Sequence, residues 1–161
     1  MATLTTKTTE TITLNGVDQG TTNTTSYTGI NNVTKRIMTL VAGVYSQLVL
    51  FSAHTYTAGG STKASTVKYI RITNLEAYNS DGSTSILLGF VGSATGMSIT
   101  LNGGQSHIMD SPVDYMVARD DDEIPALSRT YSDNETLAGI LASPASGDSQ
   151  TAKIELFIAT E

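Results

Sequence analysis

The sequence predicts an all-β protein, an antiparallel β-sandwich with jelly-roll character and an extended N-terminal arm. Charged residues make up only 15% of the 161 residues, whereas the exposed faces of helices are usually rich in Glu, Lys and Arg. Threonine occurs 26 times, and Thr, Val, Ile and Tyr all favour strands. Short apolar runs separated by turn residues recur roughly every 8 to 12 positions, which is typical of a sandwich.

The first 34 residues differ in composition from the rest of the chain. They contain 13 of the 26 threonines and little apolar clustering. A short strand over Thr11–Leu14, followed by the turn Asn15-Gly16, fits this stretch. We predict that residues 1–34 form an arm that becomes ordered across another subunit, or a first edge strand, with disorder an equal alternative for the first ten residues. The residues expected to make the arm's contacts are Thr11, Ile12, Leu14 and Val17.

Residues 35–161 are predicted to form the sandwich body. Two strands broken at Ala42-Gly43 account for the apolar stretch from Ile37 to Phe51, because it is rich in β-branched residues. After the loop at Gly59-Gly60, the segment Thr66–Leu75 alternates, with Ile70 and Ile72 on one face and Tyr69, Arg71 and Thr73 on the other.

Further strands are expected at short intervals in the second half of the chain. Ser85–Val91 is predicted to be a strand, and Met97–Leu101 and Gln105–Met109 are predicted to pair as a hairpin through Asn102-Gly103-Gly104. Val113–Ala118 forms part of a mixed segment, and Glu135–Leu141 fits either a helical turn or a short strand. Thr151–Ala159 alternates cleanly and is predicted to be a closing strand.

Composition and charge exclude several functional classes. The formal net charge is −6, and the nine Lys and Arg residues are scattered, so neither a nucleic-acid surface nor binding to acidic membranes is expected. No apolar run is long enough to span a bilayer, and Met1–Glu10 does not resemble a secretory signal, so synthesis as a cytosolic chain is expected. The absence of cysteine rules out disulfides and thiolate metal sites.

Three segments resemble a pattern found in small virion proteins of tailed bacteriophages. They are Tyr69–Leu75, which ends in Ile-Thr-Asn-Leu, Ile99–Ser106, which contains Leu-Asn-Gly-Gly, and the terminal Ile154–Ala159, which contains Phe-Ile-Ala. The resemblance extends from Thr66 to the C-terminus and leaves the first 60 residues unexplained. It implies a capsid decoration, cement or minor structural protein with a sandwich body, and it brings no catalytic residues.

Histidines and glycines offer no sign of an enzyme. His54 and His107 lack the Gly-x-Ser-x-Gly context of a nucleophile elbow, so we interpret both as strand-surface or interface residues, with pH-sensitive assembly as a weaker alternative. Gly59-Gly60 and Gly103-Gly104 match no phosphate-binding pattern and are interpreted as turns. No cofactor and no catalytic residue is predicted.

An acidic run, Asp120, Asp121, Asp122 and Glu123, provides weak candidates for calcium binding. It lacks the alternating order of an EF-hand loop, and consecutive carboxylates on an extended chain point to opposite sides. A solvated loop is the favoured interpretation, and contact with a basic partner or with Arg119 and Arg129 remains open.

Together these observations predict a capsid decoration or cement protein on the virion surface. Its expected partners are copies of itself, with a trimer favoured, and the major capsid protein or another virion protein. The alternatives are a tail, neck or fibre-associated component, or a carbohydrate-binding receptor module. Since the chain has no Trp, sugar stacking would need tyrosines as platforms: Tyr45, Tyr56, Tyr115 and Tyr131.

Overall fold

The computed structural model describes residues 1–52, 61–79, 84–92, 96–113, 116–118, 133–145 and 151–161. Almost all regular structure in these ranges is β. The only helical element there is a single 3-10 turn at Ala64–Thr66, and no described helix has the length and apolarity needed to cross a membrane. The strands are β1 (Ala2–Thr9), β2 (Thr13–Leu14), β3 (Val17–Asp18), β4 (Thr22–Ile30), β5 (Asn32–Leu40), β6 (Ser46–Ser52), β7 (Ser61–Lys63), β8 (Val67–Asn74), β9 (Ile86–Val91), β10 (Gly96–Leu101), β11 (Ser106–Met109), β12 (Met116–Ala118), β13 (Asp133–Glu135), β14 (Gly139–Pro144) and β15 (Ala152–Thr160).

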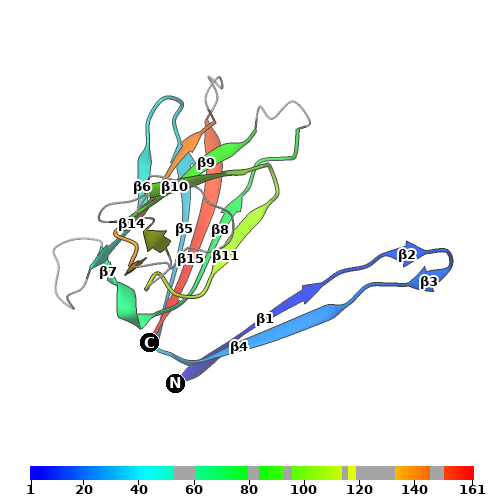
Figure 1. Ribbon diagram of the computed structural model, residues 1–161. Coiled ribbons are helices and arrows are strands. Elements are labelled where there is room, and N and C mark those ends of the chain that lie inside the picture. The colour runs from blue at the N-terminus through cyan, green and yellow to red at the C-terminus, as the bar shows by residue number, and fades with distance from the viewer. Residues whose placement is uncertain (53–60, 80–83, 93–95, 114–115, 119–132, 146–150) are drawn as a thin grey trace.

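The body of the protein is a sandwich of two sheets, which confirms the predicted fold class. One sheet has five strands in the order β10-β9-β14-β6-β7, and the other has four in the order β11-β8-β15-β5. All neighbouring strands run antiparallel except β6 and β7, which are parallel. Figure 1 shows the two sheets facing each other, with the chain termini close together at one end of the body.

The core fills the space between the two sheets. From the four-stranded sheet, Ile70 and Ile72 of β8 lie opposite Ile158 and Leu156 of β15 in the antiparallel register. The five-stranded sheet contributes further fully buried side chains, including Ile86, Leu88, Phe90 and Ile140. The alternation predicted for both β8 and β15 is therefore present, because alternate side chains of a strand point to opposite faces.

Strand β15 lies inside its sheet rather than at an edge. It pairs with β5 along one side and with β8 along the other. A strand flanked on both sides has all of its backbone groups hydrogen-bonded within the sheet. The C-terminal strand is thus the centre of the four-stranded sheet, whereas the sequence had indicated only that it closes the fold.

The predicted hairpin between Met97–Leu101 and Gln105–Met109 is wrong. Strand β10 pairs with β9 in one sheet, and β11 pairs with β8 in the other. The turn at 102–104 therefore carries the chain across the sandwich. Gly103 packs so closely against the carbonyl of Ala77 that an added Cβ would lie 2.3 Å from its oxygen. Gly104 has a positive φ of 76°, so the turn uses the glycines as expected but joins different partners.

Asn74, at the end of β8, fixes this corner of the sandwich. Its side chain is fully buried, and its amide nitrogen donates to the carbonyl oxygens of Thr84 at 2.7 Å and Leu101 at 3.0 Å. Its side-chain oxygen accepts from the backbone N–H of Glu76 at 3.1 Å. Its backbone carbonyl accepts from Gly104 at 3.0 Å. One side chain thus joins the ends of β8 and β10 and the residues that precede β9.

The N-terminal residues form a long β-hairpin that projects from the body (Figure 1). Strands β1 and β4 pair from Ala2 opposite Ile30 to Thr9 opposite Thr22, with one register shift between Ala2 and Leu4, and β2 and β3 continue to a turn at Asn15-Gly16. Both turn residues have positive φ, which suits a two-residue hairpin loop. The predicted boundary between residues 34 and 35 falls inside β5, which begins at Asn32 and already belongs to the four-stranded sheet.

We expect Asn74→Ala to destabilise the protein by about 2 to 4 kcal/mol, because it leaves the buried carbonyl of Leu101 and the partly buried carbonyl of Thr84 without their donor. Urea unfolding measured by circular dichroism would give this value. The control is Asn32→Ala, at an exposed position of β5, for which we expect a change within about 0.5 kcal/mol. Equal effects of the two substitutions would show that the Asn74 contacts do not hold the corner.

Candidate interaction surfaces

The four residues predicted to make the arm's contacts lie together at the far end of the hairpin. Leu14 pairs directly with Val17 across the turn, so the two side chains share a face. Ile12, two residues before Leu14, is also exposed. The exposed fractions of Ile12, Leu14 and Val17 are 55%, 59% and 57%. We call Ile12, Leu14 and Val17 the hairpin tip.

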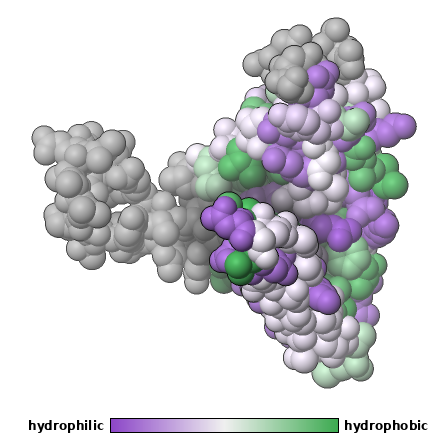
Figure 2. All heavy atoms as spheres, turned by 90° about the vertical axis from the view of Figure 1, so that its right-hand side faces the viewer, coloured by the Kyte–Doolittle hydropathy of each residue, from purple (hydrophilic) through white to green (hydrophobic). Residues whose placement is uncertain are grey.

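Most of the hairpin has no buried face. Apart from its root, nearly every residue of β1 and β4 is exposed, and the two strands are linked by threonine and serine hydroxyl contacts such as Thr9 with Thr22 at 3.3 Å. In Figure 2, which looks toward the end of the hairpin, its surface is mostly pale, with small hydrophilic and hydrophobic areas at the tip. A two-stranded hairpin of this kind is marginally stable in water by itself.

The root of the hairpin packs on the outer face of the four-stranded sheet. Ile30, Tyr27 and Leu4 contact Tyr69, Ala159 and Phe157 in a small cluster separate from the main core. The Tyr27 and Tyr69 rings lie 5.3 Å apart, and Tyr69 and Phe157 lie 5.9 Å apart in an edge-on arrangement. Burial raises the pKa of the Tyr69 hydroxyl. This cluster sets the direction in which the hairpin leaves the body.

Beyond the root, a groove separates the hairpin from the same sheet. Its volume is about 370 Å³, and it runs between β1, from Leu4 to Thr8, and the outward side chains Arg71, Ser106, Ile108 and Phe157. The groove is open to solvent. Its aromatic side chains, Tyr69 and Phe157, pack edge-on against each other.

A charged cluster occupies the centre of this outer face. The carboxylate of Glu155 on β15 accepts hydrogen bonds from the ammonium group of Lys35 on β5, at 2.9 Å, and from the guanidinium group of Arg71 on β8, at 2.6 Å. These contacts explain why Glu155 is buried although its position alternates to the outside. The hydrogen bond from Lys35, reinforced by that from Arg71, lowers the pKa of Glu155. The Arg71 guanidinium also lies 5.5 Å from the centre of the Phe157 ring, within cation–π range.

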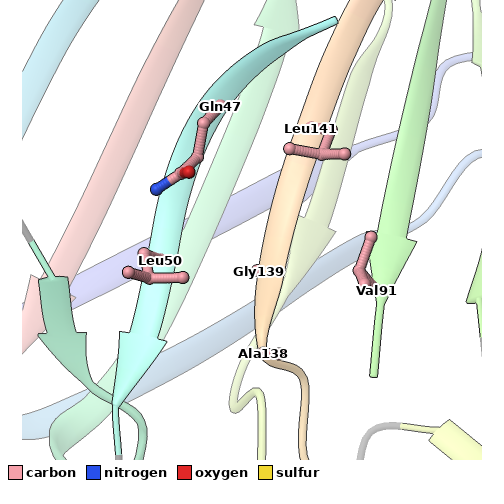
Figure 3. A pocket seen from close by; sticks show the side chains of 6 residues that line it. All are labelled: Gln47, Leu50, Val91, Ala138, Gly139 and Leu141. Carbon is pink, nitrogen blue, oxygen red and sulfur yellow. The ribbon is translucent and has the colours of Figure 1, made fainter. Parts of the chain in front are cut away.

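The outer face of the five-stranded sheet, in contrast, carries no charged side chain on four of its strands. Strands β6, β9, β10 and β14 contain no Asp, Glu, Lys or Arg. An apolar groove of about 130 Å³ lies on this face across β6, β14 and β9, and Figure 3 shows the side chains around it. Its floor is Gly139, where an added Cβ would lie 3.0 Å from the carbonyl oxygen of Val49. The residues that line the groove are Gln47, Leu50, Val91, Ala138, Gly139 and Leu141.

Neither this uncharged face nor the charged cluster was predicted from the sequence. The uncharged face could have been recognised in the sequence, because four of its strand segments contain no Asp, Glu, Lys or Arg: residues 46–52, 86–91, 96–101 and 139–144. The charged cluster could not have been recognised, because Lys35, Arg71 and Glu155 are far apart in the chain and meet only through the pairing of β5, β15 and β8.

His107 is placed by strand β11 at the edge of the core. Its ring lies 5.0 Å from that of Phe90, and its neighbour in the ladder is Ile72. Burial lowers the pKa of His107, which favours the neutral ring. This environment fits the structural interpretation of the residue.

Several predicted site residues lie outside the described residues: His54, the acidic run Asp120, Asp121, Asp122 and Glu123, and the tyrosines Tyr56, Tyr115 and Tyr131. Among the four candidate sugar platforms, Tyr45 is described and is exposed between β5 and β6. In the part of the chain that is described, no three His, Asp or Glu side chains come together as a metal site.

Comparison of this chain with protein families, with characterised proteins and with solved structures finds no match.

We expect Glu155→Gln to lower the free energy of unfolding by about 1 to 2 kcal/mol at pH 7, between the values for exposed and buried ion pairs. The pKa of Glu155 is lowered in the folded protein, so its contribution is fully present above the unfolded pKa of about 4.3 and is lost as the pH falls through the folded pKa. The difference between wild type and variant should therefore shrink below about pH 4.3. Glu161→Gln, which affects an exposed pair with Lys68, is the control and should change stability by less than about 0.5 kcal/mol.

We expect His107 to make the protein less stable in mild acid. Because its folded pKa is lowered, the unfolded chain binds more protons, so stability falls as the pH drops below the unfolded value of about 6.5. Thermal unfolding between pH 7 and pH 5 should show a smaller decrease in Tm for His107→Gln than for wild type. A parallel decrease in both proteins would exclude His107 as the source.

Proposed function

We propose that this chain is a structural protein of a tailed-phage virion, a decoration or cement protein that assembles with copies of itself on the capsid surface. The observation that carries the proposal is the projecting hairpin. Beyond its packed root, the hairpin extends into solvent with nearly every residue exposed and with three aliphatic side chains at its tip. Such an element gains stability only when a partner covers it.

The strand order of the body supports this proposal. Leaving out the short β7, the two sheets read β10-β9-β14-β6 and β11-β8-β15-β5, and every connection between successive strands of this set crosses the sandwich except that between β9 and β10. This order fits an eight-stranded jelly roll, an architecture found in viral capsid proteins and in lectins. The fold alone does not decide between those functions.

Two of the three segments that carry the phage resemblance lie in contact in the folded chain. The Ile-Thr-Asn-Leu segment ends at Asn74, and the Leu-Asn-Gly-Gly segment supplies Leu101 and Gly104, both hydrogen-bonded to Asn74. These two segments form the corner where β8 and β10 end, and the third, Ile154–Ala159, lies in β15 beside β8.

The proposed action is mechanical. A protein that binds across joints between capsid subunits buries additional area at each joint. Because it binds only the assembled state, it stabilises the shell by mass action. The low charge density of the chain suits this role, since hydroxyl groups are less costly to bury than unpaired charges. A tail, neck or fibre-associated position in the virion would use the same surfaces.

A shortened hairpin tests the proposal. Thr8 and Asn23 face each other in the β1–β4 register, so an Asn-Gly turn can replace Thr9–Thr22 while Leu4, Tyr27 and Ile30 keep the root packed. We expect the full-length chain to be a stoichiometric component of purified particles of its phage and to rebind after removal. The shortened variant should keep the Tm of the body but lose rebinding, as measured by co-sedimentation.

Two results would contradict the proposal. One is the absence of the chain from purified particles. The other is unchanged rebinding by the shortened variant. Retention of a carbohydrate ligand on a glycan array, by both the full-length and shortened chains, would instead support the receptor-module alternative with its exposed Tyr45.

A further inference from the structure

The hairpin tip and the apolar groove are two exposed apolar surfaces of the same chain that cannot meet within one copy. The root cluster fixes the hairpin on the outer face of the four-stranded sheet. The groove lies on the outer face of the five-stranded sheet, on the opposite side of the sandwich. Figure 1 shows the hairpin directed away from the body. Any contact between tip and groove therefore joins two copies.

The groove has a suitable size and chemistry for an aliphatic side chain. Leu50 and Val91 stand on either side of β14, and the missing side chain of Gly139 leaves the floor open between them (Figure 3). Its volume of about 130 Å³ is close to the roughly 150 Å³ of an apolar cavity that binds benzene. One leucine side chain of a neighbouring copy would fit such a space.

The distribution of charge favours the outer face of the five-stranded sheet over that of the four-stranded sheet as the surface that receives the tip. The tip is flanked by Glu10 and Asp18, and the strands β6, β9, β10 and β14 carry no acidic group that would repel them. On the four-stranded sheet, an aliphatic tip would instead have to cover the Lys35–Glu155–Arg71 cluster. Removing water from those charges costs free energy without a new partner in return.

We propose that the hairpin tip of one copy docks, through Leu14 and Val17, into the groove around Gly139 on a second copy. This inference rests on the self-assembly in the proposed function and adds to it the two surfaces that meet. The contact is head-to-tail, because it joins different surfaces of the two copies. Repetition of such a contact closes into a ring when the rotation between copies permits it.

Two variants block the two halves of this contact separately. Leu14→Asp places a charge on the tip, and Leu50→Asp places one beside the groove, where Leu50 is 44% exposed. Val33→Asp is the matched control, since Val33 of β5 belongs to the other sheet and is 49% exposed. Thermal unfolding checks that all three variants fold. The native mass is measured by light scattering at micromolar concentration.

The wild type and the control should form the same oligomer, whereas each blocked variant alone should run at the protomer mass of 16.9 kDa, with association at least tenfold weaker. A 1:1 mixture of the two blocked variants retains one intact tip and one intact groove. It should therefore form a dimer of twice the protomer mass and nothing larger. A contact between two tips or between two grooves would not be restored by mixing.

The proposal is overturned if the wild type is monomeric throughout, if either blocked variant keeps the wild-type mass, or if the mixture stays monomeric. Failure of the docking contact can be distinguished from failure of the proposed virion function. Incorporation of Leu50→Asp into particles at wild-type levels, together with an unchanged oligomer, would reject the docking contact and leave the virion role intact. Head-to-tail assembly by a chain that is absent from particles would do the reverse.

Discussion

The buried amide of Asn74 is the interaction on which the architecture of the body depends. A sandwich in which the chain crosses repeatedly between sheets needs corners where backbone groups leave one ladder before they join another, and unpaired buried backbone groups are costly. Asn74 supplies donors to two carbonyls and an acceptor for one N–H at such a corner. Gly103 and Gly104 then allow the chain to pass close beside it.

The two outer faces of the sandwich divide the sparse charge of the chain unequally. The four-stranded sheet gathers Lys35, Arg71 and Glu155 into one cluster and covers part of its surface with the hairpin root. The five-stranded sheet leaves aliphatic side chains and glycines on its outer side. A protein surface without charge over four adjacent strands is unusual for a soluble domain and is typical of a surface that is covered by a partner.

In the proposed assembly, the hairpin is the element that reaches a neighbouring copy. Its root is anchored by aromatic packing, while most of its length and its tip are exposed among the described residues. The body therefore fixes the direction of the hairpin at its root, and the hairpin tip stays exposed. An element with a fixed root and an exposed tip can hold a defined direction while its tip contacts a neighbouring subunit.

Local pattern in the sequence determined the fold class, the faces of β8 and β15, and the turn at Asn15-Gly16. These features follow from alternation, β propensity and glycine conformation, all of which act over a few residues. Tertiary structure alone decided which strands pair. The hairpin predicted over 97–109 failed because the same turn residues permit a crossing between sheets, and Glu155 became buried only because β15 lies between two strands that carry Lys35 and Arg71. The tip residues were predicted from their isolation in a threonine-rich segment, but the groove at Gly139 came from β6, β14 and β9 meeting side by side, a contact that depends on register across the whole chain.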